Sequence, residues 1–266
     1  MNKEIRNQII CKFQNWWNIN HGMGPAVIGI SGGKDSSVVA ALCVKALGRN
    51  NVLGVLMPDG EQRDISDSQK LCSHLKIKNI TINIQEMTIA FLKSVHLANK
   101  EFIKDNSFKP RCDFSRYTTN IPPRVRMTML YAIAQDLDGR VIGTGNAAET
   151  ACGYFTYGGD CISDFNPLRN LFVDEVVELG KLLGLLNDLV EKKPSDGLSG
   201  KTDEDNLGFT YADVKKVVLK TDDWQINTPF VDIERRIKNN AFKLEVFHVP
   251  TIDFYRDKDG KILSLK

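Results

Sequence analysis

The sequence lacks the features that mark several classes of protein. Its six cysteines form no C-x-x-C pair and its four histidines stand singly, so no spacing typical of a structural zinc site occurs. The 35 lysines and arginines nearly balance 33 aspartates and glutamates, which leaves a net charge of +2 and no basic run for nucleic acid. No stretch approaches the ~18 apolar residues of a membrane span, and the charged N-terminal segment lacks the apolar centre of a signal peptide. We therefore expect a cytoplasmic protein with reduced thiols that binds neither nucleic acid nor a membrane.

The sequence has 266 residues, of which 42% are apolar, and it alternates between segments typical of strands and segments typical of helices. Short apolar runs typical of buried strands cover residues 26–30, 52–57, 79–84 and 140–145. Segments with helical spacing lie between them, at residues 3–19, 36–47, 64–75, from about 86, and 124–137. This alternation predicts an α/β fold in which flanking helices cover a doubly wound parallel sheet, in a single domain over residues 1–266.

Beyond residue 150 the pattern is mainly helical. Phe172, Val176, Leu179 and Leu183 share one helix face, and residues 210–220 and 229–242 have helical spacing. The polar, turn-forming composition predicts mobile loops near 194–208 and 58–66. No structure is assigned to the tail, residues 243–266.

The strongest chemical signal is GISGGKDSS, residues 29–37, between an expected strand and an expected helix. Its glycines let backbone N–H groups approach an anion, its serines add hydroxyl donors, and the helix offers its positive N-terminus. A strand-to-helix turn that is merely rich in glycine is the alternative, but the accompanying Lys34 and Asp35 favour a phosphate site. The loop is not of the Walker A type, because Ile28 stands where that motif has glycine and Asp35 where it has Ser or Thr.

A second signal is GTGNAAET, residues 143–150, which also follows an expected strand. Glu149 offers the oxygen ligand that Mg²⁺ prefers. The alternative is that Glu149 only begins a helix, where the helix dipole favours glutamate. Since carboxyl ends of parallel strands share one edge of the sheet, Asp35 and Glu149 are expected to meet there, and this favours the metal site.

The S-G-G-x-D-S pattern at residues 31–36 resembles the signature of the ATP pyrophosphatase (PP-loop) superfamily. Four stretches then resemble the ammonia-dependent NAD synthetases within it. They are MPDGEQRDISDS (57–68), NIPPRVRMTMLYAIAQ (120–135), GTGNAAETACGYFTYGGDCISDFNPL (143–168) and PSDGLSGKTDEDNLGFTY (194–211). Together the similar segments span roughly residues 20–215 in the family's order.

This resemblance implies an adenine nucleotide alpha hydrolase-like fold and a homodimer with the dinucleotide near the subunit interface. It implies a reaction in which ATP adenylates the nicotinate carboxylate of deamido-NAD, pyrophosphate leaves, and ammonia displaces AMP to give NAD. The implied partners are these small molecules, and the implied cofactor is Mg²⁺. A fused glutaminase domain would need at least ~100 further residues, so we expect ammonia to arrive free or from a separate subunit.

The resemblance also implies roles for individual residues. The positions implied for ATP are Gly29, Ile30, Ser31, Gly32, Gly33, Lys34, Asp35, Ser36, Thr144 and Ser195. Those implied for deamido-NAD are Arg124, Asp164 and Tyr157; those for the metal are Asp35 and Glu149; those for catalysis are Asp35, Asp203 and Glu204.

Two of these roles have plain structural alternatives. Arg124 and Arg126 are two positions apart, about 200° around a helix, so at most one of them points at the substrate, and Arg124 could be a surface cation. Asp164 could form a turn before Asn166 and Pro167 instead of contacting a ligand.

Three departures from the family are visible. Val173 and Tyr157 stand where family members often have lysines, and the basic histidine-lysine motif near the carboxyl end is not recognised in residues 242–254. Lys34 or Lys201 could supply a substitute cation.

These departures leave rival functions open. One is another PP-loop ligase, acting on a different carboxylate or on tRNA, and the other is a non-catalytic nucleotide sensor. Release of pyrophosphate distinguishes an enzyme from a sensor.

Overall fold

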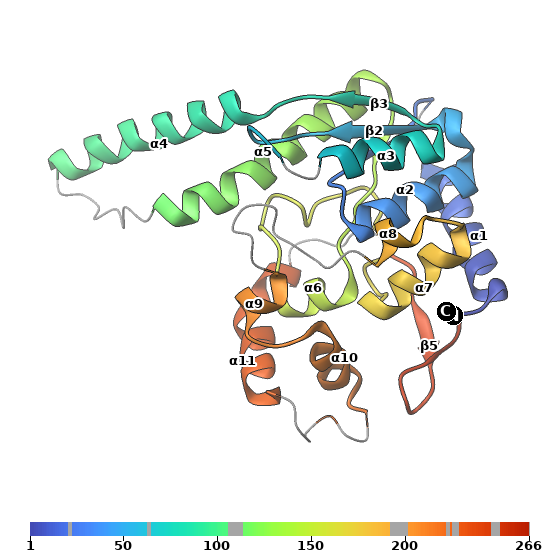
Figure 1. Cartoon of the computed structure of the whole chain (residues 1–266). Coiled ribbons are helices and arrows are strands. Elements are labelled where there is room, and N and C mark those ends of the chain that lie inside the picture. Colours follow the sequence, from blue (N-terminus) through green and yellow to red (C-terminus); the bar gives the residue numbers. More distant parts are fainter. Residues whose placement is uncertain are drawn as a thin grey trace.

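A four-stranded parallel sheet organises the protein, whose computed structural model describes residues 1–20, 23–62, 65–105, 114–191, 202–221, 224, 229–245 and 251–265. The strand order is β3 (Lys78–Thr81), β2 (Val52–Leu56), β1 (Ala26–Gly29), β4 (Arg140–Val141). Ala26 is in register with Val52 on one side and with Arg140 on the other, and Figure 1 shows the helices packed around these strands. A parallel bridge between Ile142 and Phe165 continues the sheet beyond β4.

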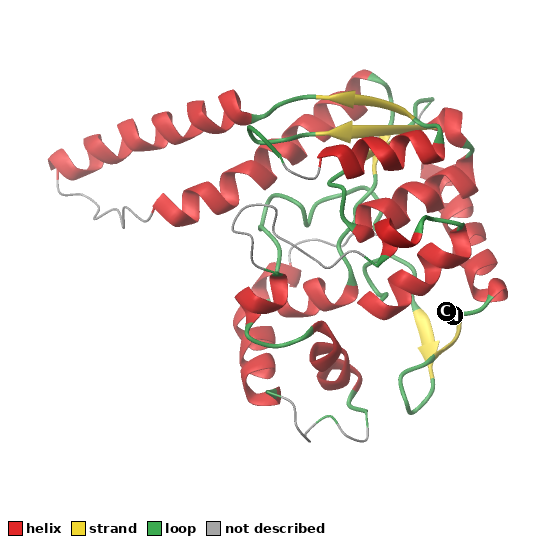
Figure 2. Ribbon diagram, in the orientation of Figure 1, coloured by secondary structure: helices red, strands yellow, loops and turns green. Residues whose placement is uncertain are grey.

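Helices make up most of the described chain, as Figure 2 shows. In the first half they are α1 (Lys3–Asn20), α2 (Lys34–Leu47), α3 (Ile65–Leu75), α4 (Gln85–Asp105) and α5 (Phe114–Asp136), with a 3₁₀ turn at Arg49–Asn51. In the second half they are α6 (Ala147–Cys152), α7 (Val173–Leu183), α8 (Asn187–Val190), α9 (Asp203–Leu207), α10 (Tyr211–Leu219), α11 (Phe230–Asn240) and α12 (Phe242–Glu245). None of the described helices combines the length and the apolar composition needed to cross a bilayer.

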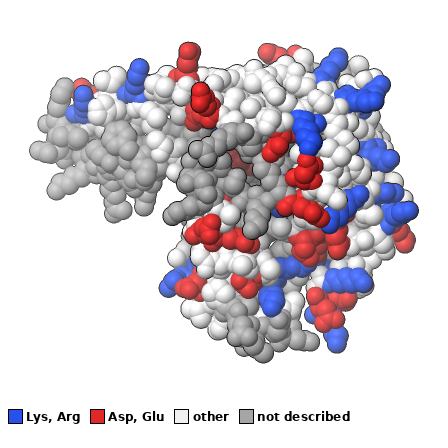
Figure 3. Space-filling view, viewed as in Figure 1, with Lys and Arg blue, Asp and Glu red and all other residues white. Residues whose placement is uncertain are grey.

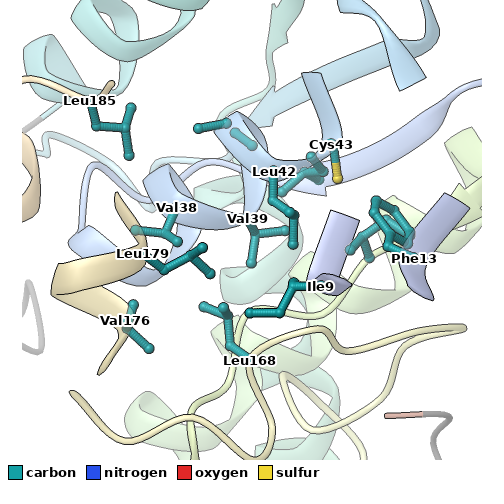
Figure 4. Packing of buried hydrophobic residues seen from close by; sticks show 14 of the residues in the cluster. Ile9, Phe13, Val38, Val39, Leu42, Cys43, Leu168, Val176, Leu179 and Leu185 are labelled. Carbon is teal, nitrogen blue, oxygen red and sulfur yellow. The ribbon is translucent and has the colours of Figure 1, made fainter. Parts of the chain in front are cut away.

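Alternate residues of β1 face opposite sides of the sheet, as the pleat of a strand requires. Ile28 belongs to a core in which α1, α2 and α7 interdigitate (Figure 4), whereas Val27 belongs to a separate core against α5. Labelled in Figure 4 are Ile9, Phe13, Val38, Val39, Leu42, Cys43, Leu168, Val176, Leu179 and Leu185. Because both faces are covered by helices, the doubly wound parallel sheet expected from the sequence is confirmed.

Helix α5 differs from the sequence-based expectation. A start near residue 124 was expected because prolines disfavour helix interiors, yet α5 begins at Phe114 and contains Pro122 and Pro123. Ile121 and Val125, on either side of the prolines, both pack in the core under the sheet. Tertiary packing therefore outweighs the local cost of the two prolines. Beyond the sheet, α4 and the outer part of α5 run alongside each other as a projecting arm (Figure 1).

The tail, to which no structure is assigned from the sequence, contains a hairpin of β5 (Phe254–Arg256) and β6 (Ile262–Leu265). Phe254 and Ile262 are buried in the core that also holds α1 and α7. The hairpin is further fixed by Arg256, whose Nη2 lies 3.0 Å from Oε2 of the buried Glu175 on α7 and donates to the Asn170 carbonyl at 2.9 Å.

We expect Arg256→Met to lower the free energy of unfolding by about 3–5 kcal/mol, because it leaves a buried carboxylate without its main partner. Denaturation by urea measures the change. Arg235→Met is the matched control, since Arg235 forms an exposed pair with Asp232 on α11 and such pairs contribute at most about 1 kcal/mol. Equal losses in the two variants would contradict the structural role of the Glu175–Arg256 pair.

Candidate active site

A cavity of about 430 Å³ opens at the carboxyl ends of the strands. Its walls come from the segments that follow β1, β2 and β4, together with α5 and parts of the second half of the chain. Parallel strands necessarily deliver their exits to the same edge, which is where ligands bind in open α/β sheets. The size is within the range of small-molecule sites.

The glycine loop forms one wall and is held by its own hydrogen bonds. Ser31 Oγ accepts from the Gly33 N–H at 3.2 Å and lies 3.0 Å from Ser36 Oγ. Gly32 has φ +81°, which a residue with a side chain rarely adopts. Gly33 is the N-cap of α2 and provides no side-chain acceptor for the first N–H groups of the helix. These N–H groups are therefore available to an anion such as a phosphate.

Lys34 and Asp35 begin α2 beside this loop. The side chain of Lys34 is only 4% exposed, and its Nζ contacts Asp35 Oδ2 at 3.1 Å. The other carboxylate oxygen of Asp35, Oδ1, is buried and has no hydrogen-bond partner among the described residues. A buried acceptor without a partner is costly, so this oxygen is aimed at a ligand that the protein itself does not supply.

Glu149 reaches the same region from the first turn of α6. Asn146 caps that helix, and Glu149 Oε2 accepts the Asn146 N–H at 2.9 Å, which completes a capping box. Burial, and then the negative charges of Asp35 and Asp203, raise the pKa of Glu149 to about 8. Asp35 and Glu149 thus line the same cavity, as expected, and Glu149 also begins a helix, whereas its metal role stays a prediction.

Asp203 and Glu204, at the start of α9, are separated by the fold. Asp203 lines the cavity and accepts a hydrogen bond from the Tyr211 hydroxyl at 3.2 Å. Glu204 is not among the cavity-lining residues, and its Oε1 accepts the Tyr211 N–H at 2.9 Å, which ties α9 to α10. Burial and the charges of Glu149 and Asp203 raise the pKa of Tyr211, so its hydroxyl remains a donor.

A second group of charges lies elsewhere on the cavity wall. Arg126 of α5 donates from Nε to the Met57 carbonyl at 2.9 Å, and the charges of Asp59 and Asp160 act on it. Lys243 of α12 donates from Nζ to the Gly153 carbonyl at 2.7 Å.

Asp160 is the acidic member of this second group. Its Oδ1 accepts the Thr156 N–H at 2.8 Å. The Asp160 side chain is accessible to solvent in the cavity. The surrounding protein nevertheless disfavours its charged form by desolvation, which raises the pKa of its carboxyl above the usual range.

Most of the residues expected at the site lie together. Those lining the cavity are Gly29, Ile30, Ser31, Gly33, Lys34, Asp35, Ser36, Thr144, Glu149 and Asp203. Gly32, with its positive φ, forms the turn between Ser31 and Gly33. Ser195 and Lys201, with the loop at 192–201, are outside the described residues.

The three residues expected at the dinucleotide lie outside the cavity lining. Arg124 is exposed and donates from Nε to the Tyr157 carbonyl at 3.1 Å. The Tyr157 ring lies 6.3 Å from that of Phe242. Asp164 Oδ2 accepts the Val141 N–H at 2.7 Å, so its carboxylate braces the end of β4.

The sequence-based reasoning missed six charged residues of the cavity wall, Asp59, Glu61, Arg126, Asp160, Arg169 and Lys243. Arg126 could have been found, because the two-residue spacing allowed only one of Arg124 and Arg126 to face inward, and the structure places Arg126 there. Lys243 had no local signal, since the fold alone brings the tail to the cavity.

The comparisons with known proteins agree with this geometry. The family model described as NAD synthase matches residues 10–246. NH(3)-dependent NAD(+) synthetases are 43% identical over 191 residues in Thermococcus kodakarensis (71% of this chain, 70% of the relative) and 35% identical over 240 residues in Pyrococcus furiosus (85% and 88%).

Two solved structures are similar over nearly their whole length. The NMN synthetase of Francisella tularensis has a TM-score of 0.78 at 33% identity, covering 93% of this chain and 98% of its own. The NH3-dependent NAD synthetase of Campylobacter jejuni has a TM-score of 0.73 at 27% identity, covering 94% and 99%. The chain described here therefore belongs to the NAD synthase family.

Proposed function

We propose that this protein amidates deamido-NAD to NAD with ammonia, using ATP and releasing AMP and pyrophosphate. The observation that carries the proposal is the convergence of the glycine loop, the unpartnered Asp35 oxygen and Glu149 at the edge of the sheet, in a member of the NAD synthase family. An amide cannot form directly from a carboxylate at neutral pH, so the carboxylate must first gain a good leaving group. Adenylation provides that leaving group.

In the first step a carboxylate oxygen of the nicotinate attacks the α-phosphorus of ATP, and the bond to the departing pyrophosphate breaks. The N–H groups at the start of α2 and the buried Lys34 stabilise the charge of that pyrophosphate. In the second step ammonia attacks the acyl carbon and AMP leaves. Asp203 lies at the cavity wall, where it can accept a proton from the attacking nitrogen.

The residues present fit a hard divalent cation. Asp35 Oδ1 is buried without a partner among the described residues, and the charge of Asp35 raises the pKa of the neighbouring Glu149. Two carboxylates at the cavity suit Mg²⁺, because this ion is usually bound by one or two carboxylates together with substrate phosphates. Bound there, Mg²⁺ would neutralise charge on the leaving pyrophosphate.

The same arrangement would serve a mononucleotide. The similarity to an NMN synthetase structure, at 33% identity over nearly the whole chain, favours amidation of nicotinic acid mononucleotide to NMN as a second candidate. Activation of the carboxylate is identical for the two substrates. The two candidate functions differ only in the substrate: a dinucleotide extends beyond its first phosphate, whereas a mononucleotide ends there.

We further propose a cytoplasmic homodimer. Cys11, Cys43, Cys72, Cys152 and Cys161 are free thiols, which suits a reducing compartment. Basic and acidic side chains are interspersed on the face shown in Figure 3, without a basic patch for nucleic acid. The projecting α4 exposes Phe91 and Leu97 to 56% and 62%, which suits contact with a second copy.

We expect pyrophosphate release that depends on ATP, Mg²⁺, ammonium and deamido-NAD, and a loss of about 100-fold or more in Asp35→Asn. A coupled pyrophosphate assay measures both. Asp188→Asn, which alters an exposed aspartate paired with Lys70, is the control and should keep full activity. Comparing kcat/KM for deamido-NAD and for nicotinic acid mononucleotide distinguishes the two candidates, and ATP binding without release from either substrate would contradict both.

The pKa of Glu149 predicts how Mg²⁺ affects stability. Because this pKa is raised from 4.5 to about 8 in the folded protein, the stability it contributes is full below its unfolded value and is lost as pH rises through the folded one. A cation that neutralises the ionised carboxylates should therefore raise the Tm more at about pH 8.5 than at about pH 6.

Thermal unfolding with and without MgCl₂ measures this difference. In Glu149→Gln and Asp35→Asn the difference should shrink markedly, whereas Glu191→Gln, which alters an exposed carboxylate paired with Lys181, should leave it unchanged. An equal effect of Mg²⁺ at both pH values would contradict the site.

We expect light scattering of the purified protein to give twice the 29.9 kDa of one chain. Leu97→Glu on the projecting α4 should shift the mass toward that of the monomer, because a charge at an apolar interface must be desolvated. Leu186→Glu, at the N-cap of α8, alters another exposed leucine and serves as the control. A monomeric wild type would contradict this assembly.

A further inference from the structure

The cavity contains two separate groups of charged side chains. In the first group, Lys34, Asp35 and Asp203 act on Glu149. The second group centres on Asp160 and Cys161, whose charges act on the three remaining basic side chains, Arg126, Arg169 and Lys243. These three belong to α5, to the segment before α7, and to α12, so the fold itself assembles the second group.

The basic side chains of the second group differ in the hydrogen bonds that they make to the described protein. Arg126 donates to the Met57 carbonyl. Lys243 donates to the carbonyls of Gly153 and Phe155, at 2.7 and 3.3 Å. Arg169 has no hydrogen bond or ion pair with any residue that the structure describes, although it is half-buried in the cavity wall.

A guanidinium without a hydrogen-bond partner in a cavity wall destabilises the folded protein. Arg169 has lost part of its hydration, and this burial lowers its pKa; a guanidinium without an acceptor recovers none of that loss. Among the described charges, only Cys161 acts on it appreciably, and a thiol is a poor counterion. Arg169 therefore offers a planar guanidinium at the cavity wall that has no acceptor among the described residues.

The charge balance shows what this end of the cavity would accept. Three basic side chains lie here with two acids, Asp59 and Asp160, and the carboxyl of Asp160 has a raised pKa and accepts the Thr156 N–H. Such a site attracts an anion, and the planar guanidinium pairs best with carboxylate or phosphate through two parallel hydrogen bonds. The carboxylate of the substrate must lie at the other group, where adenylation takes place, so a phosphate is left for this one.

We propose that Arg169 binds a phosphate of the nicotinate nucleotide and determines specificity for phosphorylated over unphosphorylated substrates. This inference rests on the proposed function. It assigns ATP and its pyrophosphate to the glycine loop and Lys34, and the nucleotide's phosphate to Arg169, with Arg126 and Lys243 as neighbouring positive charges.

The test compares Arg169→Met, which keeps an unbranched apolar stem but removes the guanidinium, with wild type in steady-state kinetics. We expect the KM for the nicotinate nucleotide to rise about 10- to 100-fold, as for a charged hydrogen-bonding pair, while the KM for ATP changes little. Arg169→Lys should recover part of the loss. Arg235→Met, which alters an exposed arginine on α11, should match wild type.

A binding experiment separates phosphate recognition from a merely structural role. Calorimetric titration with nicotinic acid mononucleotide and with its dephosphorylated riboside should show weaker binding of the nucleotide to Arg169→Met and unchanged binding of the riboside. Equal losses for both ligands, or a raised KM for ATP alone, would overturn the inference while leaving the proposed function intact. If wild type binds no nicotinate nucleotide and releases no pyrophosphate, the proposed function and the inference fail together.

Discussion

The parallel pairing of β1 with β2 and β4 is the constraint on which the site depends. Parallel strands run in one direction, so the segments that leave them must emerge at a common edge. The glycine loop after β1 and the residues that lead to Glu149 after β4 come together for this reason alone. The two helical cores on either face of the sheet then hold this edge rigid, because shifting β1 by one residue would turn Ile28 and Val27 out of their respective cores.

On this rigid edge the protein keeps several polar groups unsatisfied. The first N–H groups of α2 lack a side-chain cap, and Asp35 Oδ1 and the guanidinium of Arg169 have no partners among the described residues. Each of these groups lowers the stability of the empty protein. The three groups also differ in chemistry: the N–H groups of α2 are hydrogen-bond donors, the Asp35 oxygen is an acceptor, and the Arg169 guanidinium is a cation. A ligand that satisfies all of them must carry phosphates, bring a cation with it, and extend across the cavity.

How far the sequence predicts this structure depends on the range of the interactions involved. The glycine loop and the Asn146–Glu149 cap are local: their hydrogen bonds join residues no more than five apart, so a short motif contains nearly all the relevant chemistry. Strands β1 and β2 were predictable because their apolar runs reflect burial on both faces, whereas β3 is an exposed edge strand. The start of α5 was not, since packing on both sides of Pro122 and Pro123 outweighs the local effect of the prolines.

The cationic part of the cavity was the least predictable from the sequence. Arg169 and Lys243 are distant in the chain and no local pattern marks them, while the spacing of Arg124 and Arg126 indicates only that at most one of those two faces inward. Lys243 reaches the cavity only because α12 packs beside the residues that follow α6, where its ammonium bonds to the Gly153 carbonyl. Arg124 has the same residue type and nearly the same position as Arg126, yet it bonds to a carbonyl outside the cavity. Which of two similar arginines faces inward is set by the direction of the helix relative to the sheet, and that direction is a property of the whole fold.

The division of the cavity into two charge groups also explains how one family can include enzymes with different nucleotide products. The group around Asp35 and Glu149 serves the activation of a carboxylate, which is the same reaction for a mononucleotide and for a dinucleotide. Changes there would abolish chemistry for both. In the proposed arrangement, the group around Asp160 contacts only the phosphate side of the substrate. A terminal phosphate carries a charge of about −1.5 to −2 at neutral pH, whereas each phosphate of a dinucleotide carries a single charge. Three basic side chains beside Asp59 and Asp160, the latter with a raised pKa, therefore suit either substrate.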